Sequence, residues 1–177
     1  MYMSLILAKA IEYAAHGMSV MPVKKDKRPL LSNWKILQEK PADMEQIEQW
    51  WTANPQANVA IITGKISNLI VVDVDTYAGA TDIFPDTYTV KTGNGGLQKY
   101  YQYTPGFTIS ANGYPTMPHV DIRSDGGYVV AAPSVTDYLK DNKKAGGPYT
   151  VLNNVPYATS LHISFPPKSP NRNPRML

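Results

Sequence analysis

The sequence predicts an α+β domain, and three features of the chain indicate this class. Apolar residues recur at helical spacing in two segments near the N-terminus. From residue 59 onward the chain contains short runs rich in β-branched and aromatic residues, which are typical of strands. Several connections between these runs are short and rich in glycine, which favours hairpins over long helical crossovers. We therefore expect helices first and then a sheet.

The first predicted element is an amphipathic helix over residues 4–16. Ile6 and Ala10 recur at helical spacing, and Gly17 stands where a left-handed residue commonly ends a helix. Residues 18–23 can then form a short strand. The apolar stretch within this helix is too short to span a bilayer and is interrupted by charged residues, so we interpret it as part of a folded domain and not as a signal.

A basic loop and a second helix are expected next. Residues 24–29, with the sequence KKDKRP, predict an exposed loop that is simply solvated and leads to Trp34. The helix should begin near Asp43, whose side chain can cap free backbone N–H groups while the Gln46 side chain reaches back to the cap. It should end by Pro55. Its apolar face is expected to contain Met44, Ile47 and Trp51.

Strands dominate the middle of the chain. The β-branched and aromatic runs predict strands at residues 59–63, 69–74, 88–92, 97–103, 120–123 and 128–132. The glycine-rich connections at 93–96 and 125–127 predict hairpins between the strands on either side. We expect one domain over residues 1–165. Residues 166–177 contain four prolines in twelve residues, so we expect a linker or tail there.

The composition agrees with one compact domain and narrows the partners. The 177 residues are 43% hydrophobic and 18% charged, which is enough for a real core. A net charge of +3 and a pI near 8.9 are compatible with a phosphate-bearing partner but fall far short of a nonspecific DNA coater. Because the chain has no cysteine, disulfides and thiolate zinc sites are excluded, and a cytoplasmic location without membrane association is the simplest expectation.

The segment IVVDVD at residues 70–75 is an apolar strand that ends in two acids. Side chains at i and i+2 of a strand share a face, so Asp73 and Asp75 should lie about 6 to 7 Å apart. Oxygen ligands at this spacing suit a hard cation such as Mg²⁺ or Mn²⁺. The alternative is that both carboxylates face solvent or cap the following turn, and these residues alone favour neither explanation.

A third acid, Asp121, lies in the segment HVDIR, where alternation places His119, Asp121 and Arg123 on one face. Asp121 could complete a metal site with the first two acids. Taken by itself, it is better explained by an ion pair with Arg123, which contributes little stability if it is exposed. The metal hypothesis therefore depends on the two acidic segments coming together.

The glycine-rich segment TGNGG is a candidate phosphate site. Between Thr92 and Gly96 the backbone N–H groups could cradle a phosphate, although a plain hairpin turn explains the same residues. No P-loop or G-x-G-x-x-G pattern is present. Lys65, just after a strand, is either a triphosphate contact or, more simply, a surface lysine. The three histidines form no zinc-binding pattern.

Taken in order, the segments VVDVD, TGNGGLQ and VDIRSDGGYVVAAPS resemble the bifunctional primase/polymerase (Prim-Pol) branch of the archaeo-eukaryotic primase superfamily. The preceding KRPLLSNW and NVAIITGKIS also look like that family, and the resemblance covers residues 17–134. It implies an RRM-like catalytic sheet flanked by helices, with an N-terminal α/β portion. It also implies primer synthesis or extension on single-stranded DNA from nucleoside triphosphates, with Mg²⁺ or Mn²⁺, in a replication protein that often continues into a helicase or other C-terminal domains.

The resemblance also implies roles for individual residues. Asp73 and Asp75 match the family's first acidic motif and Asp121 its third, so these three are the expected catalytic and metal-binding residues. Two cations in such a site would hold the triphosphate and stabilise the leaving pyrophosphate. The expected nucleotide-binding residues are Lys65, Thr92, Gly95, Gly96, Gln98 and Arg123.

One position departs from the family pattern. Gln98 stands where the family usually has a histidine that contacts the nucleotide phosphates. A glutamine amide can donate a hydrogen bond but cannot become cationic, so we expect weaker triphosphate binding or attenuated activity and not loss of metal. His119 is a weaker candidate to replace that histidine. Two alternatives stay open: a noncatalytic nucleotide- or nucleic-acid-binding module of a replication protein, and a metal-dependent nuclease.

Overall fold

The computed structural model describes residues 4–105 and 117–159 and confirms the α+β class. The described α-helices are α1 (Leu5–Ala15) and α2 (Met44–Ala53), and the 3-10 turns are η1 (Trp34–Gln38), η2 (Lys65–Ser67) and η3 (Thr76–Ala78). The described strands are β1 (Val20–Val23), β2 (Asn58–Ile62), β3 (Leu69–Val74), β4 (Tyr88–Lys91), β5 (Leu97–Gln102), β6 (Val120–Arg123), β7 (Tyr128–Val130), β8 (Tyr138–Lys140), β9 (Lys143–Ala145), β10 (Thr150–Asn153) and β11 (Ala158–Thr159).

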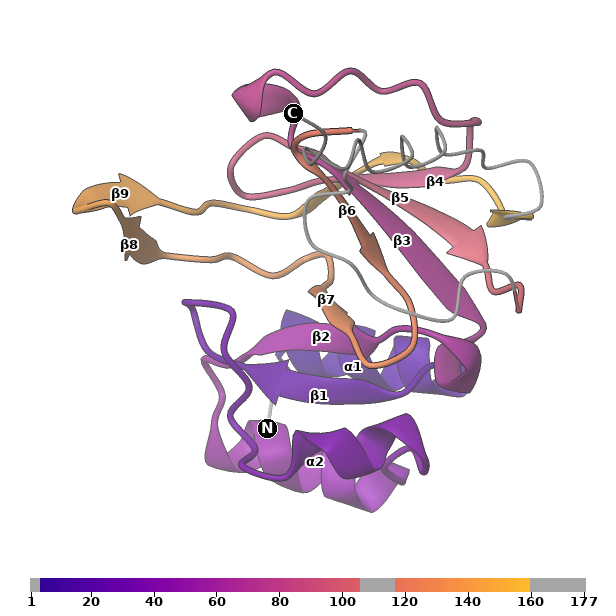
Figure 1. The fold of residues 1–177 in the computed structure, drawn as a ribbon. Coiled ribbons are helices and arrows are strands. Elements are labelled where there is room, and N and C mark those ends of the chain that lie inside the picture. The colour runs from indigo at the N-terminus through magenta and orange to yellow at the C-terminus, as the bar shows by residue number, and fades with distance from the viewer. Residues whose placement is uncertain (1–3, 106–116, 160–177) are drawn as a thin grey trace, which may run out of the picture.

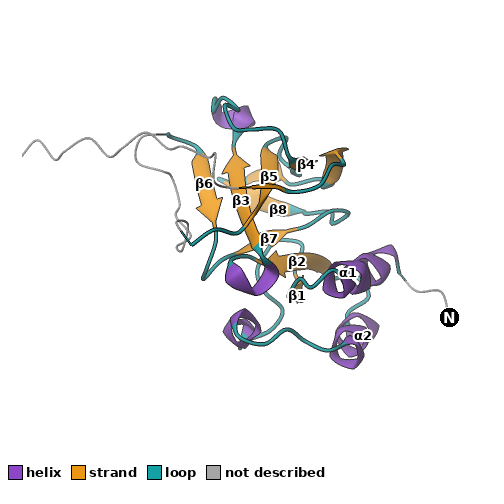
Figure 2. Ribbon diagram, turned by 90° about the vertical axis from the view of Figure 1, so that its right-hand side faces the viewer, coloured by secondary structure: helices purple, strands orange, loops and turns teal. Residues whose placement is uncertain are grey.

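These strands form two main sheets (Figure 1). The smaller sheet is antiparallel in the order β1, β2, β7, and the larger sheet has the order β10, β4, β5, β3, β6, with β11 joined to β5 in parallel. Strands β8 and β9 form a separate hairpin. Both α-helices lie beside the smaller sheet (Figure 2), where α1 contacts β1 and β2 and α2 contacts β1. The helices therefore support the N-terminal half of the chain.

Helix α1 begins and ends where local chemistry predicts. The Ser4 hydroxyl accepts a hydrogen bond from the backbone N–H of Leu7 at 3.1 Å, and Gly17 adopts a φ of 83° after the last turn. Tyr13 is buried on the inner face of the helix, and its hydroxyl donates to the Ala132 carbonyl at 2.7 Å. This bond joins the first helix to a segment 119 residues later.

Helix α2 confirms the predicted cap but not all of the predicted details. Asp43 accepts a hydrogen bond from the backbone N–H of Gln46 at 2.9 Å, whereas the Gln46 side chain donates to Gln49 and does not reach back to the cap. Trp51 is buried with Ile47. Met44, expected on the same face, is 41% exposed. It is the first helical residue, at the end of the helix, where less of the chain covers it.

One of the two predicted hairpins is confirmed and the other is wrong. Strands β4 and β5 pair antiparallel across the glycine turn, with Lys91 opposite Leu97. Strands β6 and β7 do not pair with each other. Instead β6 pairs with β3 in the larger sheet and β7 pairs with β2 in the smaller one, where Val130 lies opposite Ala60. The segment 124–127 therefore crosses between sheets, because burial of Val129 and Val130 in the N-terminal core decides where β7 lies.

Strand β3 lies between β5 and β6 in the larger sheet, and its alternating residues face two different clusters. Val71 belongs to the main core, together with Val90 from β4. Val72 belongs to a smaller cluster with Tyr101 from β5. Because residues two apart in a strand share a face, Asp73 is on the face of Val71, which is the face turned toward the main core.

The sequence patterns did not predict β8, β9, β10 or β11. Strand β10 forms the edge next to β4, and β8 and β9 pair with Tyr138 opposite Ala145. These strands are short and their residues lack a regular apolar alternation, so they gave no strand signal. The predicted tail at 166–177 lies outside the described residues. None of the helices in the described ranges has the length and apolarity needed to cross a membrane.

Candidate active site

Three of the predicted site residues form a row across the larger sheet. In the antiparallel register, Asp73 on β3 lies opposite Asp121 on β6 and opposite Gln98 on β5. Side chains directly opposite each other share a sheet face, with Cβ atoms about 4.5 to 5.5 Å apart. The two acidic segments that the metal hypothesis required to come together are therefore neighbours in the fold.

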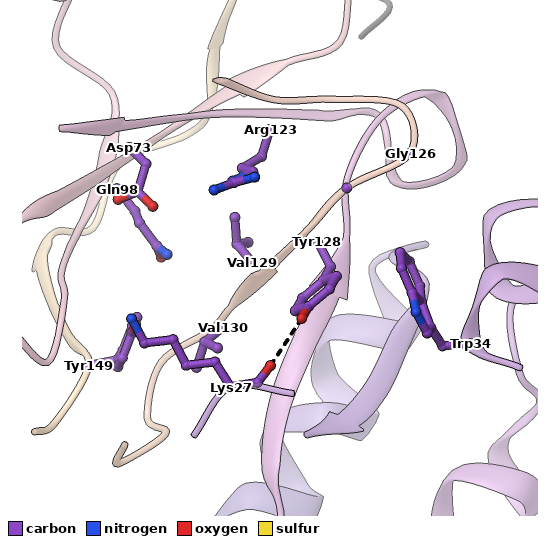
Figure 3. A pocket seen from close by; sticks show the side chains of 11 residues that line it. Lys27, Trp34, Asp73, Gln98, Arg123, Gly126, Tyr128, Val129, Val130 and Tyr149 are labelled. Carbon is purple, nitrogen blue, oxygen red and sulfur yellow. Dashed lines mark hydrogen bonds between the residues drawn. The ribbon is translucent and has the colours of Figure 1, made fainter. Parts of the chain in front are cut away.

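Asp73 and Gln98 of this row line a cavity of about 450 Å³ (Figure 3). Its walls come from the larger sheet, from β7 of the smaller sheet, and from the loop between β1 and η1. Figure 3 shows Asp73, Gln98 and Arg123 on one side, with the Lys27 side chain extending into the cavity from its loop. The lining residues are Lys27, Trp34, Asp73, Gln98, Arg123, Gly126, Gly127, Tyr128, Val129, Val130 and Tyr149.

Asp73 has an unusual electrostatic environment. Its burial raises the pKa of the carboxyl to about 7, helped by the nearby charges of Asp75 and Asp121 and opposed by the positive charges of Arg123 and Lys27. A carboxyl with this pKa is only partly ionised at neutral pH. The pKa shift therefore marks a position where negative charges are crowded and only partly compensated.

Asp75 follows directly after β3 and stays near the other two acids. Burial raises its pKa, a hydrogen bond with Tyr77 lowers it, and the charge of Asp121 raises it again. The backbone N–H of Asp75 donates to the carbonyl of His119 at 2.9 Å, which holds the ends of β3 and β6 together. Of the three acids, Asp73 lines the cavity described above, whereas Asp75 and Asp121 do not.

Asp121 forms the ion pair that its sequence allowed. The Arg123 guanidinium donates to the Asp121 carboxylate at 2.8 Å, and both side chains are about one quarter exposed. Across residues 4–105 and 117–159, no three His, Cys, Asp or Glu side chains are arranged as a metal-binding group. The ion pair thus occupies one carboxylate oxygen of Asp121 while keeping the Arg123 side chain beside Asp73.

The glycine turn 92–96 packs against the end of β3. A side chain on Gly96 would meet the Val74 carbonyl at 3.0 Å and the Asp75 Cα at 3.5 Å, so only glycine fits easily beside the acids. Within the turn, the Thr92 N–H donates to Gly96 at 2.8 Å and the Gly95 N–H donates to Thr92 at 2.9 Å. These two N–H groups are used by the turn itself, which favours the plain hairpin explanation over a phosphate cradle at these positions.

Two other candidates are not brought into the cavity. Lys65 lies on η2 before the start of β3, its side chain is exposed, and its backbone N–H donates to Asp125 at 2.8 Å. His119 precedes β6 with an exposed side chain, and it does not line the cavity as Gln98 does. His16 is exposed after α1, and His162 lies outside the described residues.

The basic loop 24–29 contains a cavity residue that the sequence patterns missed. Lys27 adopts a φ of 73°, and its ammonium lies 4.7 Å from the centre of the Tyr138 ring. The Lys27 carbonyl accepts a hydrogen bond from the Tyr128 hydroxyl at 3.1 Å. The expectation that the whole loop is simply solvated is therefore wrong for Lys27, because the turn directs this side chain inward. Lys24 and Lys25 beside it are exposed as expected.

Comparison with known families agrees with this geometry. Residues 10–170 match the family described as "Bifunctional DNA primase/polymerase, N-terminal". A search of curated proteins gave no match. The family match covers most of the chain and includes the row of Asp73, Asp121 and Gln98. It supports a function of the DNA primase/polymerase type, with nucleotides and DNA as substrates. The chain therefore belongs to the bifunctional DNA primase/polymerase family.

Proposed function

We propose that this chain catalyses metal-dependent nucleotidyl transfer from a nucleoside triphosphate to the 3′-hydroxyl of a primer on single-stranded DNA. The observation that carries the proposal is the placement of Asp73 between Asp121 and Gln98 at the wall of the cavity. In the reaction, the 3′-oxygen forms a bond to the α-phosphorus of the triphosphate. The bond between the α-phosphorus and the oxygen that bridges to the β-phosphate breaks, pyrophosphate leaves, and the hydroxyl proton passes to solvent.

The three acids Asp73, Asp75 and Asp121 supply the oxygen ligands that a hard divalent cation prefers, and a bound cation would have to draw them into one group. Asp73, Asp75 and Asp121 would hold Mg²⁺ or Mn²⁺, since both ions prefer carboxylate oxygens. The raised pKa values of Asp73 and Asp75 support this fit, because burial and mutual repulsion are penalties that a bound cation would relieve. When bound, the metal would supply charge stabilisation at the attacking hydroxyl and the leaving pyrophosphate.

Positive and aromatic side chains around the row suit a nucleotide. Lys27 and Arg123 line the same cavity as Asp73 and place two cations where a triphosphate would lie. Tyr128 and Trp34 form an aromatic wall, with their rings packed edge to face and the ring centres 5.1 Å apart. We infer that the cations orient the phosphates and that the aromatic wall contacts the sugar or base. In this proposal Lys27 makes the triphosphate contact that the sequence patterns suggested for Lys65.

Because Gln98 stands where the family usually has a histidine, we propose that the activity of this chain is attenuated. Its side chain is 3% exposed, lines the cavity, and accepts a hydrogen bond from the Tyr100 hydroxyl at 3.3 Å. The amide can still donate to a phosphate oxygen, but a neutral donor contributes less than a cationic one. We expect triphosphate binding that is weaker than a histidine at this position would allow.

The test is a primer-synthesis and primer-extension assay on single-stranded DNA with Mg²⁺ or Mn²⁺. The parent chain is compared with Asp73→Ala and with the exposed control Asp86→Ala. Synthesis by the parent and the control, but not by Asp73→Ala, supports the proposal. Equal synthesis by Asp73→Ala and the parent would overturn it, because the central carboxylate would then be dispensable.

A second candidate function is a noncatalytic nucleotide-binding module, and Gln98 is the observation that favours it. Calorimetric titration with a nucleoside triphosphate and Mn²⁺ separates the two. Binding by a parent chain that never extends a primer, under conditions where Gln98→His does extend it, would assign the noncatalytic role. Extension by the parent itself excludes that role.

A further inference from the structure

The hairpin β8–β9 stands apart from both sheets and projects from the body of the molecule (Figure 1). Its two turn residues, Asp141 and Asn142, have φ values of 52° and 60°, which is typical of a tight two-residue hairpin turn. The exposed residue Leu139 at its outer part is 72% accessible. A projecting hairpin of this kind adds little to the core, so packing does not explain which side chains it presents to solvent.

Three lysines give this hairpin a positive surface. Lys140, Lys143 and Lys144 are all exposed, and Asp141 is the one acid within residues 138–145. Lys140 lies directly opposite Lys143, so both share a face, while Lys144 lies opposite Leu139 on the other face. Like charges directly opposite each other are unfavourable in an isolated hairpin, and an anionic partner would relieve this repulsion.

The base of the hairpin is held beside the candidate active site. The Asn94 side chain in the glycine turn donates to the Tyr138 hydroxyl and accepts from the Gly146 N–H at 2.8 Å. Gly93 in the same turn packs directly on Gly147, where an added side chain would lie 2.6 Å from the Gly147 carbonyl oxygen. Since this turn also contacts Asp75, the lysines have a defined position relative to the acids.

A groove of about 330 Å³ runs between the hairpin and the active-site edge. The three lysines line it together with Tyr77, Asn94, Ala145 and one acid, Asp141, so three cations face a single carboxylate. Tyr77 is 47% exposed, and the Lys140 ammonium lies 6.0 Å from the centre of its ring. The groove therefore combines an exposed aromatic ring with positive charge, and Tyr77 stands two residues after Asp75 in the chain.

We propose that the groove between hairpin β8–β9 and Tyr77 binds the sugar-phosphate backbone of single-stranded nucleic acid, with one base stacked on Tyr77. Lysines beside an aromatic ring are the combination that binds single strands without sequence preference. The groove shares no lining residue with the cavity of Lys27 and Arg123, where the triphosphate is placed, so we assign the groove to the strand. This inference rests on the proposed function, which requires a strand to pass the acids.

The test measures fluorescence anisotropy of a labelled single-stranded oligodeoxynucleotide, in EDTA and without nucleotides. Lys143→Ala/Lys144→Ala is compared with Lys35→Ala/Lys40→Ala, which removes two exposed lysines elsewhere. We expect the hairpin variant to bind about tenfold more weakly at moderate salt, with a salt slope that is shallower by about 0.7 for each phosphate it no longer neutralises. The control should match the parent. Equal affinity and slope in both variants would overturn the inference.

Two further measurements test which ligand the groove binds. Tyr77→Phe should retain binding and Tyr77→Ala should weaken it, since stacking needs the ring and not the hydroxyl. A hairpin variant that loses triphosphate affinity but binds the oligonucleotide normally would also overturn the inference, in favour of a nucleotide subsite. Because the binding assay contains no metal or nucleotide, its outcome does not depend on synthesis, whereas Asp73→Ala in the extension assay tests the proposed function alone.

Discussion

Asp73 on β3 lies directly opposite Gln98 on β5, so the residue that departs from the family pattern is a neighbour of the central acid of the site. Gln98 is buried and lines the same cavity as Asp73. Any change of charge at position 98 therefore acts on Asp73 as well as on a ligand.

The first prediction concerns this neighbour. Gln98→His should raise triphosphate affinity roughly tenfold at pH 6, because a protonated imidazole donates a charge-assisted hydrogen bond that is stronger than that of an amide by about 1.5 kcal/mol. The gain should shrink toward pH 8 as the imidazole loses its proton. Calorimetry at the two pH values measures it. Gln102→His, at an exposed position on the same strand, is the control. A gain that is equal at both positions would contradict the prediction.

The second prediction is a pH dependence of stability that Asp73 causes. Its folded-state pKa of about 7 lies above the ordinary value, so the folded protein binds a proton that the unfolded chain releases between about pH 4 and pH 7. Stability should fall across this window, by at most about 4 kcal/mol from this group, and the loss should be complete above pH 7. Without divalent metal, Asp73→Asn should unfold at a higher denaturant concentration than the parent at pH 8.

At pH 3 the parent and Asp73→Asn should be nearly equal in stability, since the carboxyl is then mostly protonated in both folded and unfolded chains. Asp86→Asn, at an exposed aspartate, should follow the parent at both pH values. Urea unfolding in EDTA makes the comparison. If Asp73→Asn were less stable than the parent at pH 8, the burial penalty assigned to this carboxyl would be wrong.

The third prediction concerns the metal. Mn²⁺ at about one hundred times its dissociation constant should stabilise the folded parent by about 2.7 kcal/mol, because it binds the folded state only. Asp73→Asn should lose most of this stabilisation, whereas Asp86→Asn should keep it. Thermal unfolding with and without Mn²⁺ measures the difference. The same stabilisation in all three proteins would place the bound ion elsewhere.

The fourth prediction concerns a buried charge on the other face of the sheet. Lys99 is 2% exposed, and its ammonium donates to Asp82 at 2.9 Å and to the Phe84 carbonyl at 2.8 Å. Asp82→Ala should destabilise the protein by about 3 kcal/mol, because it leaves a buried cation without its carboxylate. Glu12→Ala breaks the more exposed Lys9 pair and should change stability by less than about 1 kcal/mol. Equal effects in urea unfolding would show that the Lys99 ion pair has no special weight.

The fifth prediction concerns the glycine turn. Gly93→Ala should be strongly destabilising, since the added Cβ would lie 2.6 Å from the Gly147 carbonyl oxygen and 2.7 Å from its nitrogen, and backbone atoms cannot move aside alone. Gly95→Ala meets no atom within 4 Å and should cost only about 1 to 2 kcal/mol for its φ of 91°. Urea unfolding ranks the two. A larger loss at Gly95 would mean that backbone conformation, not the close contact, limits this turn.

Much of the local structure could be predicted from the sequence. The Asp43 cap, the left-handed Gly17 after α1 and the bounds of β3 and β6 are as predicted. The physical reason is that caps, helical spacing and runs of β-branched residues depend on residues close together in the sequence, so a short segment is enough to predict them. The motif order also indicated the family, which the match over residues 10–170 confirms.

What the sequence determined by itself was local: which segments form the two α-helices and strands β1 to β7, where the acids Asp73, Asp75 and Asp121 stand in them, and that Gln98 replaces the usual histidine. The tertiary structure alone decided that β7 leaves β6 for the smaller sheet and that Lys27 enters the cavity. Both depend on burial and pairing between segments far apart in the chain. Such contacts are chosen by the packing of the whole core, which no single segment specifies.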